Sequence, residues 1–444
     1  MHRLLVTGLL AFALTGLSPF ALTGCGGSDG IGDPSETPPD APANNDPSFT
    51  IANVNGWYLI GDDVTPGQNA LEVEVTTPAG TEAVDIWIAG GIGERLDSTG
   101  ANTFAATFDL SDLAAGEHEL LFAADGSTTA FARMTIKRSA PYYVIVTTDW
   151  DDADTIDDAL GFQDDLHDEH PHLKLTHFVG PYTFTDPTLT TQRVTLLTDW
   201  LKGHRDTYDD EIGLHIHPYC HFVEYAGETC IDRPSFANPV ADNSGYSVPV
   251  WVYDETQFTT LLNAADDLFV ENGLGKPTSF RAGGWSLVLA TMKALENAGY
   301  VADTSANNWA RLEEWKGSGS LYQWNKDNWG PINDTSQPYY PSRDDILVAS
   351  EPSINVLEVP DNGILVDYVT TDEMVEIFGA NWDGSVLSGP VQLSIGYHPS
   401  NFTEDRYIRM TDTMTHIDQF LAATGDGPVV YATLSDMAKV WKRN

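Results

Sequence analysis

The stretch Tyr142-Tyr-Val-Ile-Val-Thr-Thr-Asp-Trp-Asp-Asp152 decides the fold class of this chain, because it joins a continuous apolar run to a cluster of carboxylates. An apolar run bounded in this way is typical of a strand that is covered on both faces. Carboxylates directly after such a strand indicate a functional site at the carboxyl end of a parallel sheet. We therefore expect a buried strand over 142–148 and a site that begins at Asp149.

Downstream of this stretch the sequence alternates between strand patterns and helix patterns. Further strands are expected at 174–179, 211–217, 278–283, 300–305, 355–359, 391–398 and 429–433. Helices are expected at 155–170, 189–204, 255–272, 287–298 and 406–423. Repeated alternation predicts an α/β fold with a parallel sheet, most simply closed as a (β/α) barrel over 139–444.

Upstream, residues 48–138 show short segments in which apolar and polar residues alternate. The segments are 69–77, 83–89, 103–109, 117–124 and 129–136, and turn formers such as Pro66-Gly67 and Asp125-Gly126 separate them. This pattern predicts a small all-β, immunoglobulin-like sandwich. Because no cluster of titratable residues stands out there, the sandwich is either a spacer or a module that contacts carbohydrate.

Residues 1–24 have the layout of an export signal: a short charged region, an apolar stretch from Leu4 to Leu22, and small residues before Cys25. A transmembrane helix is the alternative, but Pro19 interrupts the run and its length is marginal for a bilayer. The Leu-Thr-Gly-Cys ending resembles a bacterial lipoprotein signal and implies lipidation of Cys25. Residues 25–47 are rich in Gly and Pro, which predicts a disordered linker.

The formal net charge of −43 limits the partners of the chain. A surface this acidic repels polyanions, which excludes a nucleic-acid partner. Solubility, for example in a saline habitat, explains the charge better than a specific cationic ligand. An apolar content of 42% is ordinary for a globular chain.

A second polar cluster, Glu211-Ile-Gly-Leu-His-Ile-His-Pro-Tyr-Cys-His221, contains three histidines within seven residues. His215 and His217 lie on one face if the segment is extended, because side chains alternate along a strand. Asp149 and Asp151 have the same relation. Imidazole and carboxylate suit Zn²⁺ and its first-row neighbours, and a catalytic site needs about three such ligands plus an open position for water. The two clusters together predict a mononuclear metal site.

Five polar clusters follow successive strands, and their order resembles that of the polysaccharide deacetylase family of carbohydrate esterases. The clusters are 147–152, 211–221, 280–285, 303–305 and 395–399. The resemblance covers roughly residues 141–440 and leaves the sandwich outside it. It implies a deformed (β/α) barrel and metal-assisted removal of acyl groups, usually N-acetyl, from an amino sugar.

The resemblance also implies roles for single residues. Asp149 matches the catalytic base. Asp151 or Asp152 matches a metal-binding aspartate, and we choose Asp151 because the inserted Trp150 makes an Asp-x-Asp pair. His398 matches the late histidine that acts as general acid. Arg281 matches the arginine that orients the base, and Asp303 the fourth motif, so both would hold the base and the acid in geometry and protonation state.

The match departs from the family at the second metal histidine. His215 matches the first one, but the position four residues later is Tyr219. His217 or His221 must then complete the ligand set, and we choose His217 first because it shares a face with His215. The proline of the family's arginine motif is Gly283 in this chain.

The three cysteines divide between two tasks. With Cys25 assigned to lipid, Cys220 and Cys230 can form a disulfide, which an oxidising exported compartment would favour. Two free thiols remain an alternative, as does Cys220 as a metal ligand.

The stretch 306–344 reads as a long connection that is rich in aromatic residues, including Trp309, Trp324 and Trp329. Its aromatic content argues against disorder. Flat rings with a polar edge suit pyranose faces, so these residues either line a glycan groove or pack against each other as a lid.

Our leading hypothesis is an exported, lipid-anchored, metal-dependent deacetylase, with a divalent cation, Zn²⁺ first, as cofactor. The expected partner is an acetylated glycan, the membrane is contacted only through the lipid, and no particular oligomeric state is predicted. One alternative is a metal-free glycoside hydrolase that uses two carboxylates and leaves the histidine cluster unexplained. Another is a catalytically inactive glycan-binding lipoprotein, which Tyr219 favours.

Overall fold

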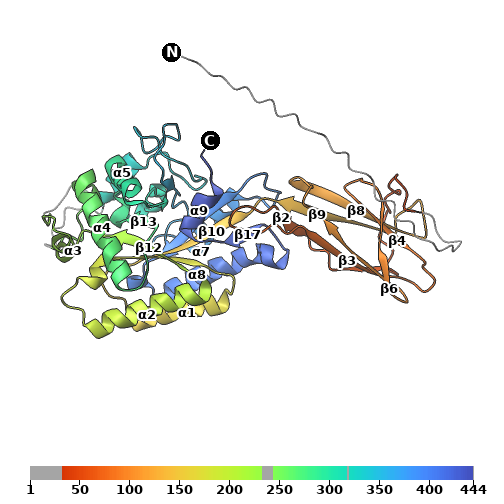
Figure 1. Ribbon diagram of the computed structural model, residues 1–444, viewed down its shortest axis with the longest axis horizontal. Coiled ribbons are helices and arrows are strands. Elements are labelled where there is room, and N and C mark those ends of the chain that lie inside the picture. The colour runs from red at the N-terminus through yellow and green to blue at the C-terminus, as the bar shows by residue number, and fades with distance from the viewer. Residues whose placement is uncertain (1–32, 233–243, 318–319, 444) are drawn as a thin grey trace, which may run out of the picture.

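The computed structural model describes residues 33–232, 244–317 and 320–443. An all-β part and an α/β part lie end to end along the long axis of the molecule (Figure 1). The expected export signal and Cys25 lie outside the described residues. Within the described ranges, no helix has both the length and the apolar character needed to cross a membrane.

The all-β part consists of two sheets packed face to face. One sheet has the strand order β1 (Thr50–Ala52), β3 (Ala70–Thr76), β7 (Thr103–Asp109), β6 (Asp97–Gly100). The other has the order β2 (Trp57–Leu59), β9 (Ala132–Ser139), β8 (Gly116–Ala124), β4 (Val84–Ile88), β5 (Glu94–Arg95). Alternate residues of β3, namely Leu71, Val73 and Val75, point into a core shared with Phe122 and Ile136 of the second sheet. The immunoglobulin-like description of this sandwich stays a prediction.

Residues 33–47, which we expected to belong to a disordered linker, lie along the sandwich. The backbone of Asp40 pairs with the turn between β8 and β9, donating to Thr128 O and accepting from Ala130 N, both at 2.9 Å. The indole nitrogen of Trp87 donates to Ser35 O at 3.1 Å. The expectation of disorder is therefore wrong for this segment, because its backbone groups find partners on the sheet.

The α/β part is built on an eight-stranded sheet in which all neighbouring strands are parallel. The order is β15 (Leu357–Glu358), β14 (Ala302–Asp303), β13 (Ser279–Ala282), β12 (Glu211–Ile216), β11 (Leu175–Val179), β10 (Tyr142–Asp149), β16 (Val391–Tyr397), and β17 (Val429–Tyr431) also pairs with β10. Every residue of β10 is buried, as its apolar run predicted. The expected α/β barrel class is confirmed.

An irregular segment, 363–366, closes the sheet. No strand in the described ranges connects β15 to β16 directly, but this segment follows β15 and hydrogen-bonds to β16. Gly363 N donates to Ser394 O at 2.8 Å, and Val366 N donates to Gly396 O at 2.8 Å. The result is a deformed barrel whose last gap is filled by backbone without strand geometry.

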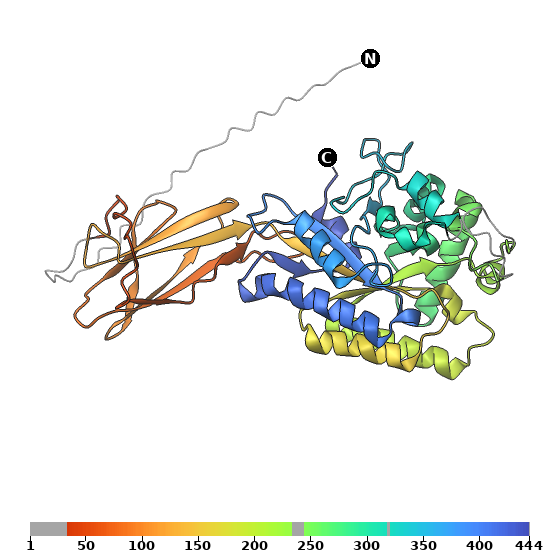
Figure 2. The ribbon, with the colours of Figure 1, turned by 180° about the vertical axis from the view of Figure 1, so that it is seen from behind.

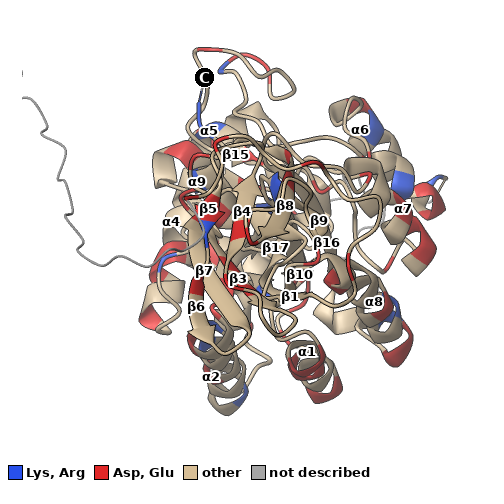
Figure 3. Ribbon diagram, turned by 90° about the vertical axis from the view of Figure 1, so that its right-hand side faces the viewer, with Lys and Arg blue, Asp and Glu red and all other residues tan. Residues whose placement is uncertain are grey.

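Helices surround this barrel (Figures 1 and 2). They are α1 (Asp157–Glu169), α2 (Thr191–Tyr208), α3 (Cys220–Tyr225), α4 (Glu255–Glu271), α5 (Leu289–Ala298), α6 (Leu321–Asn328), α7 (Thr371–Asn381), α8 (Glu404–Ile417) and α9 (Leu434–Val440). Helices α4 and α7 begin with capping boxes, in which Asp254 and Thr370 accept from the first turn. Asp and Glu are spread over helices and strands alike (Figure 3), as expected if the charge serves solubility.

The sandwich and the barrel share one continuous stretch of extended chain. Strand β9 ends at Ser139 and β10 begins at Tyr142. Arg138, almost fully buried at this junction, donates to Leu59 O at 2.8 Å and to Gln68 O at 2.9 Å. The side-chain amide of Gln68 in turn donates to Ala422 O of the barrel at 2.7 Å. These bonds connect the two parts through buried polar groups.

The closing segment predicts a stability effect at Gly396. A Cβ at this position would overlap Thr147 and lie 2.8 Å from Leu365 Cδ2. Gly396→Ala should therefore lower the free energy of unfolding by about 1–3 kcal/mol, measured by urea denaturation. Gly379→Ala in α7 is the matched control, because no atom lies within 4 Å of its added methyl group and alanine favours a helix. Equal changes in the free energy of unfolding for Gly396→Ala and Gly379→Ala would contradict tight packing at the closing segment.

Candidate metal centre and active site

The carboxyl ends of β10, β12 and β16 bring the sequence-predicted site residues to one end of the barrel. Asp149 is the last residue of β10, His215 is the fifth residue of β12, and His398 follows β16 directly. Parallel strands all end at the same edge, so clusters far apart in the sequence meet there. The site residues come from widely separated segments for this reason.

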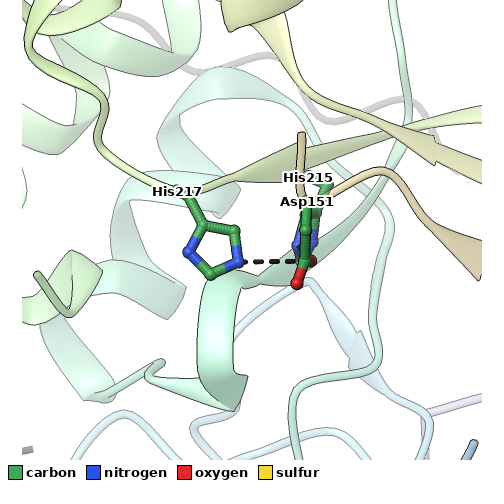
Figure 4. Close-up of side chains that lie close together, drawn as sticks. All are labelled: Asp151, His215 and His217. Carbon is green, nitrogen blue, oxygen red and sulfur yellow. Dashed lines mark hydrogen bonds and ion pairs between the residues drawn. The ribbon is translucent and has the colours of Figure 1, made fainter. Parts of the chain in front are cut away.

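Asp151, His215 and His217 form a compact group of possible metal ligands (Figure 4). The Nε2 atoms of His215 and His217 lie 3.1 Å and 3.3 Å from Asp151 Oδ1. In a tetrahedral zinc site, with bonds of about 2.0–2.2 Å, neighbouring ligand atoms are about 3.4 Å apart. The spacing of this group therefore fits one metal ion.

The hydrogen bonds behind the two histidines fix their tautomers. The Nδ1 atom of His215 lies 2.9 Å from Arg281 O, and that of His217 lies 2.9 Å from Tyr246 O. A carbonyl oxygen only accepts, so each Nδ1 donates and, in a neutral ring, Nε2 carries a lone pair. That lone pair faces a carboxylate oxygen, which is unfavourable unless a cation or a proton lies between them. The donor set thus fits a divalent metal, with the backbone partners that metal-bound histidines usually have.

Two tyrosines complete the surroundings of Asp151. Tyr246 donates its hydroxyl to Asp151 Oδ2 at 3.0 Å, and its ring stacks on His217 with centroids 4.3 Å apart. Tyr219, at the position of the family's second histidine, has its hydroxyl 3.4 Å from Asp151 O. Sequence reasoning missed Tyr246, because it lies in a stretch without helix or strand periodicity.

His221 does not belong to the ligand group, so its inclusion as a candidate was wrong. Helix α3 begins at Cys220 and turns the next side chain away from the strand end. The Nδ1 atom of His221 lies 2.9 Å from Thr185 Oγ1. In the structure Cys220 is bonded to Cys230 in a disulfide, and its sulfur is not directed to the metal group.

Asp149 is held by a fully buried guanidinium. Arg281 Nη1 lies 2.9 Å from Asp149 Oδ1 and also donates to Thr147 Oγ1 at 2.9 Å. Its Nη2 lies 3.3 Å from Asp361 Oδ2, and Trp285 Nε1 donates to the same oxygen at 3.0 Å. Arg281 thus orients Asp149 from behind, as the resemblance implied, while Asp361 is a partner that sequence reasoning did not identify.

Asp303 lies deeper in the barrel and does not contact His398. It accepts from Ser305 N and Ser305 Oγ, both at 2.9 Å. Burial and the neighbouring carboxyl of Asp303 raise the pKa of Glu358 well above its usual value. The charge of Asp303 also favours the protonated form of Arg281. Asp303 therefore supports Arg281 and not His398.

The partner of His398 is Asp367, which sequence reasoning missed. His398 Nδ1 lies 3.2 Å from Asp367 Oδ2, and Arg406 Nε lies 3.2 Å from the other carboxylate oxygen. Burial lowers the pKa of His398, but the charges of Asp151 and Asp367 outweigh burial and raise this pKa to about 10. The imidazole is therefore a proton carrier whose Nε2 lies 3.6 Å from Asp151 Oδ2.

Asp151 is an anion in this setting. Burial would raise its pKa, but the neighbouring imidazoles, the charged His398 first, outweigh burial and lower the pKa well below its usual value. An ionised carboxylate is the form that binds a metal.

A cavity of about 230 Å³ lies over the metal group and contains the side chains of Asp149, Asp151 and His398 in its wall. Its aromatic wall is formed by Tyr246, Trp285, Trp315 and Tyr368. One cavity therefore brings Asp149, His398 and the candidate metal ligands to the same space.

Trp309, Trp324 and Trp329, our candidates for sugar contact, do not line this cavity. Trp329 is fully buried and donates its indole N–H to Trp285 O at 3.0 Å. Trp324 belongs to α6, a helix inside a stretch that was expected to be an irregular connection. Trp329 supports the cavity wall from outside through Trp285, while Trp315 of the same stretch lines the cavity itself. Both the lid and the groove therefore stay open as functions of this stretch.

The chain matches no family model and no curated protein. Several solved structures with a similar fold are polysaccharide deacetylases or carbohydrate esterases. A protein assigned as a polysaccharide deacetylase from Mycobacterium smegmatis is 14% identical, with 68% of this chain and 93% of that chain covered and a TM-score of 0.41. A family 4 carbohydrate esterase from Streptomyces lividans is 9% identical, with 69% and 100% covered and a TM-score of 0.34.

A 4-alpha-glucanotransferase from Thermococcus litoralis is also similar, at 9% identity, with 68% of this chain and 41% of that chain covered and a TM-score of 0.40. Likeness at this level assigns no activity, because an esterase and a glucan transferase share it. Only the geometry of the site distinguishes these chemistries.

The ligand geometry predicts different metal contents for three histidine variants. His215→Ala and His217→Ala should each lose one metal ion per chain relative to the parent, because either change leaves two ligands. His221→Ala should keep the parent content, since its ring bonds Thr185. Elemental analysis after Zn²⁺ loading and dialysis measures this. Loss of metal from His221→Ala with retention in His217→Ala would contradict the ligand set.

Proposed function

We propose that this chain is a metal-dependent hydrolase that removes N-acetyl groups from an amino-sugar glycan. The observation that carries the proposal is the convergence of three metal ligands, Asp149 and His398 on one cavity. A metal-free glycoside hydrolase is a poorer fit, because Asp151 already faces two histidines and a tyrosine hydroxyl.

A divalent cation at Asp151, His215 and His217, with Zn²⁺ the expected ion, would polarise the acyl carbonyl and acidify a water molecule. Asp149, oriented by Arg281, accepts a proton from the water that attacks the acyl carbon. The attack gives a tetrahedral centre, from which the C–N bond breaks. His398 donates a proton to the departing nitrogen, so the products are acetate and a free amine.

The acid must carry a proton when the base does not, and each has a charged partner. Arg281 Nη1 forms an ion pair with Asp149 Oδ1 at 2.9 Å. Asp367 beside His398 stabilises the imidazolium. An amine is a poor leaving group unless it is protonated, so a histidine that holds its proton at neutral pH suits the second half of the reaction.

The sequence supports the location of this activity. The N-terminal pattern of residues 1–24 and Cys25 supports export and lipid anchoring to a bacterial cell envelope. An acetylated cell-surface or extracellular polysaccharide is the substrate class that fits such a location.

Asp149→Asn tests the base. The amide keeps the shape of the side chain but cannot take a proton, so turnover should fall by about 10²–10⁴-fold while metal content stays at the parent value. His215→Ala should lose both activity and one metal ion. The measurement is acetate release from N-acetylglucosamine oligomers by the full-length protein, with elemental analysis in parallel.

Parent-level turnover in Asp149→Asn would disprove the assignment of the base. A parent protein that binds metal at this site but releases no acetate from any acetylated glycan would favour the inactive glycan-binding alternative.

Asp367→Asn tests the acid through the pH profile. Activity requires protonated His398, so it declines as the pH rises through the pKa of this group. Loss of the Asp367 charge lowers that pKa. The alkaline limb of kcat/KM should therefore move to lower pH, which a pH–rate profile of parent and variant measures.

Asp412→Asn is the control, because it removes the same charge from an exposed position on α8. An alkaline limb that stays in place in Asp367→Asn would show that His398 is not the proton donor.

A further inference from the structure

A second cluster of histidines lies outside the barrel interior, between the sheet and helices α1 and α2. These two helices run over the same part of the barrel's outer surface (Figures 1 and 2). His167 comes from α1, His177 from β11 and His204 from α2, and Asp210 precedes β12. Each of the four is at most 4% exposed. The proposed deacetylation uses none of them.

All three imidazoles face one carboxylate oxygen. The distances to Asp210 Oδ2 are 2.9 Å from His167 Nε2, 3.1 Å from His177 Nε2 and 3.2 Å from His204 Nδ1. The other oxygen, Oδ1, accepts from Leu175 N at 2.8 Å. Burial raises the pKa of Asp210, but the surrounding histidines outweigh burial and hold this pKa far below its usual value, so the carboxylate is an anion.

His177 is a hydrogen-bond donor to Asp210. The indole N–H of Trp150 donates to Thr148 Oγ1 at 3.2 Å, which leaves the Thr148 hydroxyl free to donate to His177 Nδ1 at 3.2 Å. His177 Nε2 then carries the proton and donates to the carboxylate. A chain of hydrogen bonds therefore connects Asp210 to β10, next to Asp149.

His204 has the opposite arrangement. Its Nε2 atom lies 2.8 Å from Asp164 Oδ1, and a carboxylate only accepts, so Nε2 donates its proton. In the neutral ring Nδ1 then bears a lone pair that faces Asp210 Oδ2. Two lone pairs at 3.2 Å repel each other unless a cation or a second proton lies between them. This is the same conflict that occurs between Asp151 and its histidines.

The spacing of three of these groups fits one metal ion. His167, His204 and Asp210 each offer one ligand atom, and these atoms all lie within 4.8 Å of one another. A proton on His204 would relieve only its contact with Asp210, whereas a divalent ion with bonds of about 2.0–2.2 Å would bind all three residues at once. Asp164 on His204, and His177 and Leu175 N on Asp210, are outer partners of the kind that hold metal ligands in place.

We propose that His167, His204 and Asp210 form a second, structural metal centre for Zn²⁺ or a similar first-row cation. Two imidazoles and one carboxylate suit this class of ion. The ion connects α1, α2 and the start of β12, and the hydrogen-bond chain through His177 connects it to the end of β10. The centre is independent of the proposed activity, because it shares no ligand with the site in the barrel.

The test is metal binding by the full-length protein with the first site removed. In His215→Ala/His217→Ala, we expect about one Zn²⁺ per chain to remain after loading and dialysis, against about two in the parent. Adding His167→Gln and His204→Gln should remove this last ion. Co²⁺ substitution of the first double variant should also give the visible absorption of a low-coordinate cobalt site.

A stability measurement distinguishes loss of the metal from misfolding of a variant. A chelator should lower the melting temperature of His215→Ala/His217→Ala by several degrees, because an ion that binds only the folded state stabilises it. His170→Gln is the matched control, since it removes another buried imidazole, bonded to Asp418 and Thr411, without touching the cluster. It should keep the metal and the response to chelator.

If His215→Ala/His217→Ala binds no Zn²⁺ and its melting temperature does not respond to chelator, the second centre does not exist. That result differs from failure of the proposed function, in which the parent would release no acetate from acetylated glycans, whatever the metal content of this variant.

Discussion

The register of β10 determines where both polar clusters form. Side chains alternate along a strand, so Thr147 and Asp149 point into the barrel, where Arg281 binds both. Thr148 points outward and contacts His177 of the second cluster. A slip of one residue would exchange these faces and remove the carboxylate from the cavity. The buried run that begins at Tyr142 and pairs along its whole length with β16 excludes such a slip.

Most of the barrel could be predicted from the sequence because its signals are local. The strands follow from continuous apolar runs, and the larger helices follow from their periodicity and start signals. Helices α3, α6, α7 and α9 were missed, and so was the closing segment 363–366. Its pairing with β16 depends on a strand far away in the sequence, and no local pattern records it. The linker expectation failed for a related reason: a Gly- and Pro-rich composition does not exclude docking onto a nearby sheet edge.

The candidate site also contains residues that the sequence could predict and residues that it could not. Residues at strand ends were identified correctly as neighbours, because topology alone brings them together. His221 was misplaced because the sequence does not show that β12 ends at Ile216 and that α3 begins at Cys220. The aromatic candidates failed because a count of rings does not tell which face they present, and Trp329 is a core residue. Asp367 could have been found by the strand-end rule, had the closing segment been recognised. Tyr246 had no such signal.

The direction of β10 determines how far the cavity lies from the sandwich. The strand leaves the sandwich at Tyr142 and delivers Asp149 about 25 Å farther on, so the cavity opens away from the sandwich. The folded chain is already docked on the sandwich at Ser35. If Cys25 carries lipid, the intervening residues can span at most about 35 Å even when fully extended. That span, together with the sandwich and β10, would then set the greatest distance between membrane and cavity.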